Sequence, residues 1–245
     1  MYKYERTLLL AMPKGELERP AFDALRKIGY VIPEPNGKEY ITQVENAPII
    51  LFRGRASDIP KNVFEKDSDV VAGITGSDIL WEEGYNRGRI GSEVPVELFF
   101  AGVKRPDIYL GVTEEFSDNI KKQTGRTVIP QDLSGKILFS KYANIAKDFM
   151  QDNGVYDVDI RRRGGSIEGM RYAYKDSVAL VDIWVSGRTA MDNCIIKAAT
   201  ITPVITTLFE DTTKASAFEQ RVVDDIRDKI FIEKQRMQSL STAFA

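Results

Sequence analysis

Residues 177–193 read SVALVDIWVSGRTAMDN. The first part is rich in apolar and β-branched side chains, which predicts a buried strand over 177–185 that has the carboxylate of Asp182 at its carboxyl end. The small residues 186–189 then turn the chain into a helix-like segment. A strand that passes through such a turn into a helix is the building unit of an open α/β sheet, and these sheets bind ligands where their strands end. The stretch therefore predicts an α/β fold with a binding site at this turn.

Strands and helices alternate in the same way along most of the chain. Further apolar segments that predict strands lie at 7–12, 47–54, 70–76, 136–141 and 157–160. Segments with helical spacing or helix-start signals lie between them, at 17–28, 57–66, 77–84, 142–154 and 166–177. This order predicts an α/β protein with open, mainly parallel sheets that carry helices on both faces.

The alternation occurs in two series, which predicts two lobes. A hinge near 104–106 and a return crossing near 200–205 assign residues 1–105 and 205–245 to the first lobe and residues 106–204 to the second. The C-terminal tail repeats apolar residues at four-residue steps and predicts one more helix. That helix either packs against its own lobe or binds a partner.

Composition excludes several classes of function. The 245 residues include no histidine, which removes catalytic triads, histidine-ligated zinc and imidazole acid–base chemistry. A net charge of −2 gives no basis for a nucleic-acid groove or an anionic membrane surface. No apolar run approaches the roughly 18–20 residues that span a bilayer, and Pro13 interrupts the N-terminal run too early for a secretory signal.

The remaining chemistry suits phosphate handling inside the cell. A single cysteine, Cys194, excludes an internal disulfide and favours a reducing compartment, so we expect a cytoplasmic protein. Ser186 and Thr189 offer hydroxyl donors to a phosphate, and Gly187 lets its backbone approach one closely. Asp182 suits ribose hydroxyls or a Mg²⁺ ion that a polyphosphate carries. The alternative is a Ser/Gly/Thr turn that caps an ordinary helix.

Five motifs, in the same order, resemble those of the ATP phosphoribosyltransferase family. They are LLLAMPKGEL, LFRGRASDIPKNV, VVAGITGSDILWEEG, LSGKILFSKYANIAKDF, and GGSIEG followed by VDIWVSGRTAMDN. Together they extend over residues 7–193. The resemblance implies two periplasmic-binding-protein-like lobes with a cleft between them. It also implies the first step of histidine biosynthesis, in which the phosphoribosyl group of phosphoribosyl pyrophosphate (PRPP) moves to N1 of ATP and pyrophosphate is released.

The resemblance also implies roles for single residues. In the second lobe, PRPP would bind to Asp182, Ser186, Gly187, Arg188 and Thr189. Glu168 would join Asp182 around the ribose and its Mg²⁺, the implied cofactor. In the first lobe, ATP or the leaving pyrophosphate would bind to Lys14, Gly15, Arg55 and Asp78. The implied catalytic residues are Lys14, Arg55, Glu168 and Asp182.

Structural roles remain open for three of these side chains. Lys14 could instead cover the first turn, Arg55 could form a surface ion pair, and Glu168 could lie in the first turn of a helix.

Three departures from the family pattern leave the acceptor open. Glu16 stands where a cation is usual, Gly37-Lys38 stand where another arginine is frequent, and Arg188 replaces a small residue. Two alternatives to ATP phosphoribosyl transfer therefore remain. One is a PRPP-dependent transferase with a different acceptor, and the other is a non-catalytic binding or regulatory protein.

The length after the second lobe bears on partners. Residues 205–245 are too few for the regulatory domain of long-form members, so the resemblance implies the short form. In the family, the short form works with a catalytically inert paralogue of histidyl-tRNA synthetase, and we expect such a partner here as well as a symmetric homo-oligomer.

Overall fold

The computed structural model describes residues 4–34, 39–83, 96–97, 106–174 and 177–243. The chain forms two compact units, of which unit 1 comprises Met1–Val103 and Ile205–Ala245 and unit 2 comprises Lys104–Val204. Most of the predicted hinge near 104–106 lies outside the described residues. None of the described helices is long and apolar enough to cross a membrane.

Unit 1 is built on a six-stranded mixed sheet. The strand order is β2 (Ile41–Gln43), β3 (Ile49–Arg55), β1 (Leu8–Lys14), β4 (Ala72–Gly76), β11 (Thr206–Glu210) and β5 (Val96–Glu97). The central strand β1 runs parallel to both of its neighbours, and the remaining pairs are antiparallel. The helical segments are α1 (Glu18–Lys27), the 3-10 turn η1 (Ala56–Asp58), α2 (Ile59–Phe64), α3 (Ser77–Glu82) and α8 (Ala217–Ala243).

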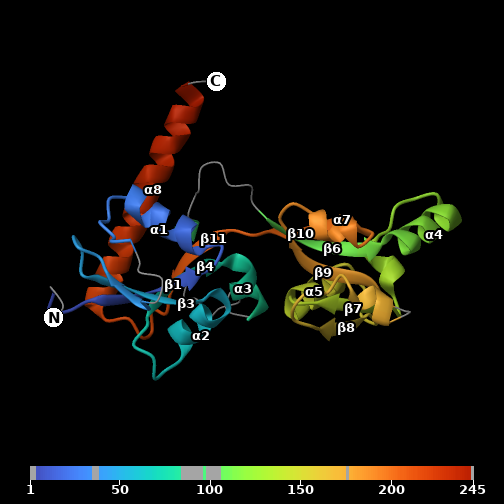
Figure 1. The fold of residues 1–245 in the computed structure, drawn as a ribbon, viewed down its shortest axis with the longest axis horizontal. Coiled ribbons are helices and arrows are strands. Elements are labelled where there is room, and N and C mark those ends of the chain that lie inside the picture. Colours follow the sequence, from blue (N-terminus) through green and yellow to red (C-terminus); the bar gives the residue numbers. More distant parts are fainter. Residues whose placement is uncertain (1–3, 35–38, 84–95, 98–105, 175–176, 244–245) are drawn as a thin grey trace. The chain divides into compact units, whose positions relative to one another are not determined.

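Helices cover both faces of this sheet because successive strand side chains point to opposite sides (Figure 1). Leu8, Leu10 and Met12 of β1 belong to one buried cluster, with residues of α1 and α8. Ala11 belongs to a second cluster, with residues of α2 and α3. The apolar stripe of α8, including Ile226, is part of the first cluster, so the C-terminal helix packs on its own unit.

Unit 2 is built on a five-stranded mixed sheet. The strand order is β10 (Ile195–Pro203), β6 (Asp107–Thr113), β9 (Ser177–Trp184), β7 (Ile137–Ser140) and β8 (Asp159–Arg162). The strand β7 runs parallel to β9 and β8, whereas β6 runs antiparallel to β9 and β10. The helical segments are α4 (Glu114–Thr124), η2 (Pro130–Leu133), α5 (Ala143–Asp152), α6 (Met170–Ala173) and α7 (Arg188–Asp192).

The structure confirms the α/β class and refines two local expectations. Each sheet has a parallel group of three strands, and antiparallel strands complete it, so the sheets are mixed rather than mainly parallel. The helix predicted over 166–177 is wrong, because α6 has only four residues. Gly165 adopts a left-handed φ of 76°, and Ile167 is buried in the core of unit 2, which holds the chain before α6 in a loop.

Candidate functional site

Asp182 is a buried carboxylate with both oxygens engaged. It lies on β9 opposite Tyr109 of β6, two residues before the strand ends at Trp184 rather than at the strand end itself. The residue is 3% exposed. Its Oδ1 accepts a hydrogen bond of 2.8 Å from the Ile183 N–H, and its Oδ2 lies 3.2 Å from Nζ of Lys141. Burial raises the pKa of Asp182 above its usual range, and the hydrogen bond and Lys141 oppose that rise.

Glu168 is the second buried carboxylate of unit 2. It lies in the loop before α6, with Gly169 between it and the first helical residue, and it is 9% exposed. Its Oε2 is buried and has no hydrogen-bond partner among the described residues. The negative charge of Glu168 is one cause of the raised pKa of Asp182. The pKa of Tyr109 is raised as well, mainly by burial, then by the charge of Asp182 and least by that of Glu168. The two predicted carboxylates therefore share one electrostatic environment beside Tyr109.

The turn after β9 is shaped by an aromatic contact. Gly187 has a left-handed φ of 75°, and a Cβ placed there would lie 2.0 Å from the indole ring of Trp184. That indole meets the ring of Tyr109 edge-on, with the centroids 4.8 Å apart. The backbone N–H of Arg188 donates a long hydrogen bond of 3.4 Å to Oγ of Ser186. The predicted phosphate turn is thus a tight glycine turn that rests on Trp184.

The side chains of this turn leave room for a ligand. Ser186, Arg188 and Thr189 are exposed, whereas the backbone of Gly187 is buried against the indole. Exposed hydroxyls and a guanidinium can each donate to phosphate oxygens, and the tight turn brings backbone N–H groups close together.

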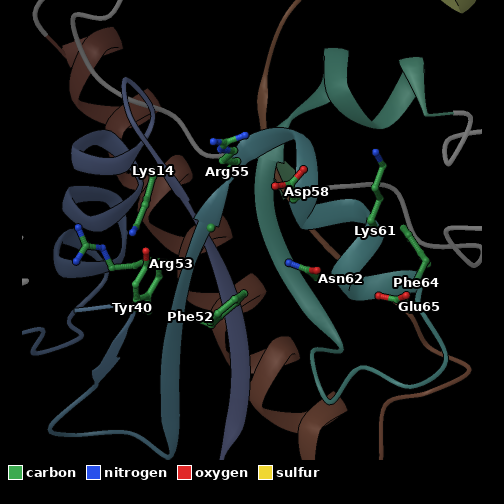
Figure 2. A pocket seen from close by; sticks show the side chains of 11 residues that line it. Lys14, Tyr40, Phe52, Arg53, Arg55, Asp58, Lys61, Asn62, Phe64 and Glu65 are labelled. Carbon is green, nitrogen blue, oxygen red and sulfur yellow. The ribbon is translucent and has the colours of Figure 1, made fainter. Parts of the chain in front are cut away.

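In unit 1, the ends of two parallel strands form the edge of a hollow. Lys14 and Arg55 are register partners at the carboxyl ends of β1 and β3. Both line a hollow of about 760 Å³. In Figure 2, Asp58, Lys61 and Asn62 line it from the side of η1 and α2.

Aromatic rings complete the hollow. Tyr40, Phe52 and Phe64 contribute to its lining. Nζ of Lys14 lies 3.7 Å from the centroid of the Tyr40 ring, which is the geometry of a cation–π contact. The hollow therefore combines cations with flat apolar faces, a mixture that suits a phosphorylated aromatic ligand.

Two of the four first-lobe predictions do not belong to this hollow. Gly15 follows β1 as an exposed residue with a φ of 88°, and Asp78 is buried in the first turn of α3. Neither residue lines the hollow. Glu16 is exposed before α1, and the acidic residue in the first turn of that helix is Glu18. Gly37-Lys38 lie outside the described residues.

Sequence reasoning missed several residues around both sites. Lys141 pairs with Asp182 across neighbouring strands, which only the register of β7 and β9 reveals. Tyr40 reaches Lys14 from a segment near β2. Arg53, two residues before Arg55, also lines the hollow, but it is 5% exposed and forms an ion pair with Glu18. Its Nη1 also donates to the carbonyl of Glu39 over 2.6 Å.

The carboxylates suit a metal ion that brings its own ligands. Among the described residues, no group of three or more acidic or cysteine side chains is arranged to hold a metal ion. Glu168 and Asp182 make a pair, and one oxygen of Glu168 is unpartnered. Mg²⁺ is commonly held by one or two carboxylates together with substrate phosphates, so the residues present fit Mg²⁺ bound together with a phosphorylated substrate.

The fold and the sites define a class of protein. Two α/β units, a buried carboxylate pair, a glycine turn after β9, and a hollow lined by cations are suited to binding phosphorylated ligands. The sequence model of the family described as HisG, ATP phosphoribosyltransferase, matches residues 55–231. The chain belongs to the ATP phosphoribosyltransferase family.

Individual relatives and solved structures agree with this assignment. An ATP phosphoribosyltransferase of Thermococcus kodakarensis is 30% identical over 194 residues, which are 79% of this chain and 82% of that relative. The ATP phosphoribosyl transferase (HisG:HisZ) complex from Thermotoga maritima contains a chain with a TM-score of 0.63 and 21% identity, covering 91% of this chain and 98% of that one.

A binding protein shares the fold. The periplasmic aliphatic sulphonate binding protein SsuA from Escherichia coli has a TM-score of 0.51 at 14% identity, and the match covers 97% of this chain and 77% of that one.

These comparisons confirm the predicted family and the periplasmic-binding-protein-like fold class. The predicted reaction is confirmed as well, namely phosphoribosyl transfer from PRPP to ATP in histidine biosynthesis.

Proposed function

We propose that unit 2 binds PRPP at Asp182, Glu168 and the turn 186–189, and that the hollow of unit 1 binds ATP or the pyrophosphate that leaves. The observation that carries this proposal is the buried carboxylate pair, in which Oε2 of Glu168 has no hydrogen-bond partner among the described residues and Glu168 is electrostatically coupled to Asp182. A buried carboxylate oxygen without a partner is costly, and a ribose hydroxyl or a cation supplies the missing interaction.

The turn 186–189 and the carboxylate pair suit different parts of PRPP. The turn 186–189 offers N–H and O–H donors, which suit the 5′-phosphate. The carboxylates accept hydrogen bonds and therefore suit the 2′- and 3′-hydroxyls of the ribose. Bound Mg²⁺ would neutralise charge on the pyrophosphate of PRPP, and Glu168 and Asp182 are the residues that would hold it.

In the hollow of unit 1, Lys14 and Arg55 are the proposed ligands of polyphosphate. They come from adjacent strand ends, and the Arg55 side chain is exposed. Tyr40 and Phe52 offer ring faces for a purine. Gly15 and Asp78, which the family resemblance places with ATP, do not line the hollow, so we assign no contact to them.

The chemistry requires no imidazole. N1 of adenine has a lone pair at neutral pH, and it attacks C1′ of PRPP while the bond from C1′ to the pyrophosphate oxygen breaks. No proton has to be removed from N1 beforehand, which agrees with a chain that has no histidine. Holding both substrates in line supplies up to roughly 7–11 kcal/mol. Lys14 and Arg55 would stabilise charge on polyphosphate in the transition state.

The family relationship supports a proposal on partners and location. The Thermotoga maritima neighbour is a HisG:HisZ complex. We propose that this chain likewise works with a histidyl-tRNA-synthetase-like regulatory subunit and forms a symmetric homo-oligomer. Its two substrates are cytoplasmic metabolites, so we place the enzyme in the cytoplasm. Size-exclusion chromatography with light scattering of the purified chain measures the oligomer, and a monomer at assay concentration contradicts it.

The decisive experiment is direct product detection. The purified chain is incubated with ATP, PRPP, Mg²⁺ and pyrophosphatase, which removes pyrophosphate and draws the reaction forward, and phosphoribosyl-ATP is sought by mass spectrometry. We expect product from the wild type and little from Asp182→Asn. Chelation by EDTA should stop the reaction, and added Mg²⁺ should restore it. Product formation that persists in EDTA contradicts the metal requirement.

Binding separates the remaining outcomes. PRPP should raise the melting temperature of the wild type in the presence of Mg²⁺. Binding of PRPP without product from ATP would point to a different acceptor or a missing regulatory subunit. Absence of both binding and product would contradict the proposed function of this chain.

A further inference from the structure

Lys141 is held beside the carboxylate pair by the end of β7. Oγ of Ser140 donates to the carbonyl of Val181 over 2.8 Å and accepts from the N–H of Tyr142 over 2.8 Å. Ser140 is 0% exposed, so this small network fixes the backbone on both sides of Lys141 against the strand that carries Asp182. Nζ of Lys141 lies 3.2 Å from Oδ2 of Asp182. The alignment of the parallel strands β7 and β9 therefore places Lys141 beside Asp182.

The ion pair has one buried and one accessible partner. The Asp182 side chain is 4% exposed, whereas the Lys141 side chain is 36% exposed. Removing a carboxylate from water is costly unless an opposite charge and hydrogen bonds compensate for it. Lys141 supplies the opposite charge to Asp182, and the Ile183 N–H supplies a hydrogen bond.

The two carboxylates are consequently not equivalent. Both oxygens of Asp182 are engaged, but Oε2 of Glu168 has no hydrogen-bond partner among the described residues. A second negative charge next to an unpaired Asp182 would repel both that carboxylate and any phosphorylated ligand. With Lys141 in place, the group formed by Asp182, Glu168 and Lys141 has a net charge closer to −1 than to −2, and Asp182 is fixed in one orientation.

We propose that Lys141 is a positioning residue of the PRPP site, which fixes the orientation of Asp182 and offsets its charge, so that Asp182 and the unpartnered oxygen of Glu168 receive the ligand together. This proposal rests on the proposed function of the same site. Lys141 acts through Asp182 and has no contact of its own with the ribose. The competing arrangement, in which its ammonium leaves Asp182 and binds the pyrophosphate of PRPP directly, is an outcome of the test below.

A double-mutant cycle tests whether Lys141 acts through Asp182. The proteins are the wild type, Lys141→Met, Asp182→Asn and the double variant, with Lys141→Arg as the conservative variant. Lys147→Met is the matched control, because Lys147 is an exposed lysine of α5, six residues further along the chain. Calorimetry measures the dissociation constant of PRPP with Mg²⁺, and steady-state kinetics measure KM for PRPP and for ATP together with kcat.

We expect Lys141→Met to weaken PRPP binding in the presence of Mg²⁺ about 10- to 100-fold, by analogy with the removal of residues that orient the ligands of a metal ion. KM for ATP should change less than about 2-fold, because Lys141 belongs to unit 2 and the hollow proposed for ATP belongs to unit 1. Lys141→Arg should restore most of the affinity, and Lys147→Met should resemble the wild type. In the Asp182→Asn background, Lys141→Met should have little further effect.

Several results would overturn the proposal. If the losses of PRPP affinity caused by Lys141→Met and by Asp182→Asn multiply in the double variant, Lys141 binds PRPP directly. Equal changes in both KM values, or a loss that Lys141→Arg does not restore, would show a general structural role. If Lys141→Met does not fold, the same comparison between Lys141→Arg and Lys141→Gln decides.

The binding assay separates this proposal from the proposed function. Wild-type protein that binds PRPP but makes no product from ATP points to a different acceptor or a missing regulatory subunit, and the binding cycle still decides the role of Lys141. Wild-type protein that does not bind PRPP contradicts both.

Discussion

The two candidate sites use opposite means to receive phosphorylated molecules. The site of unit 2 has buried carboxylates, a lysine in contact with one of them and a glycine turn on an indole ring. The hollow of unit 1 has cations at strand ends and aromatic rings around them. The first arrangement is prepared for hydroxyls and a metal ion, and the second for phosphate charge and a flat base. The difference implies that changes in unit 2 should affect PRPP and changes in the hollow should affect ATP.

The largest effect is expected from Asp182→Asn. The substitution keeps the shape but removes the charge that Lys141 and the proposed metal share. We expect kcat/KM for PRPP to fall about 10²- to 10³-fold, comparable to the loss of a group that stabilises the transition state. Steady-state kinetics at saturating ATP measure the change.

The matched control is Asp152→Asn, because Asp152 is an exposed acidic residue at the end of α5. It should leave kcat/KM unchanged. A fall of less than about 5-fold in Asp182→Asn would remove Asp182 from the site and with it the contrast between the two units.

The next effect concerns stability in unit 2, through Gly187→Ala. The new Cβ meets the Trp184 ring at 2.0 Å, and the left-handed φ of 75° disfavours alanine. Because Trp184 is held against Tyr109, the ring has little freedom to move away. We expect a loss of about 2–4 kcal/mol from strain and overpacking together, measured by urea unfolding, and a higher KM for PRPP.

Gly125→Ala separates the two causes. Gly125 has a φ of 74°, but a Cβ there would meet nothing within 4 Å. That variant should lose only the conformational part, about 1–2 kcal/mol, and should keep the wild-type KM for PRPP. Equal losses in both variants would show that the contact with Trp184 is unimportant.

In unit 1, two arginines on one strand should behave differently. Arg53→Met removes the buried partner of Glu18 and should cost about 2–3 kcal/mol, below the range for a fully buried pair because Glu18 is 25% exposed. Arg55→Met removes an exposed cation at the edge of the hollow, so it should leave the free energy of unfolding almost unchanged and raise KM for ATP about 10-fold. Urea unfolding and steady-state kinetics measure the two changes.

The opposite result, in which Arg55→Met lowers stability and Arg53→Met raises only KM for ATP, would exchange the roles of the two arginines. Lys66→Met, which changes an exposed lysine after α2, is the control for loss of a surface charge. It should alter neither stability nor KM. An equal rise of KM for PRPP and for ATP in Arg55→Met would break the assignment of one substrate to each unit.

Sequence patterns predicted the elements of the fold more fully than its contacts. The strands around Leu10 and Asp182 were predictable because apolar runs of the right length have few other uses. The mixed sheets were not, because strand direction depends on which segments pair, and local sequence does not record pairing.

The candidate sites show the same limit. Asp182 was predictable, since a carboxylate in an apolar strand needs a compensating partner, and Arg55 was found through family resemblance. Lys141 could be recognised only after the register of β7 and β9 was known. Arg53 differs from Arg55 through its burial and its contacts with Glu18 and Glu39, which lie outside β3. Charges that serve the fold and charges that serve a ligand look alike in sequence, and only the contacts that each makes in the folded chain separate them.

The smallest effect is expected for an ion pair of unit 2 outside both proposed sites. The Arg126 guanidinium donates to both carboxylate oxygens of Asp132, over 2.7 and 2.8 Å, and lowers the pKa of Asp132. A carboxyl group whose pKa is lowered in the folded state stabilises the protein above its unfolded pKa of about 4, and the contribution is lost as the pH falls through the folded value.

The prediction is therefore a pH-dependent difference in melting temperature between the wild type and Arg126→Met. Arg126→Met should melt slightly lower at pH 7, and the difference should begin to shrink as the pH falls below about 4 and be lost once the pH is below the lowered pKa of Asp132 in the folded wild type. Lys122→Met, which changes an exposed lysine of α4, should show no such pH dependence. KM for PRPP and for ATP should not change in either variant. A changed KM in Arg126→Met would mean that charges outside the two sites tune substrate binding, and the contrast between the units would then rest on more than their local chemistry.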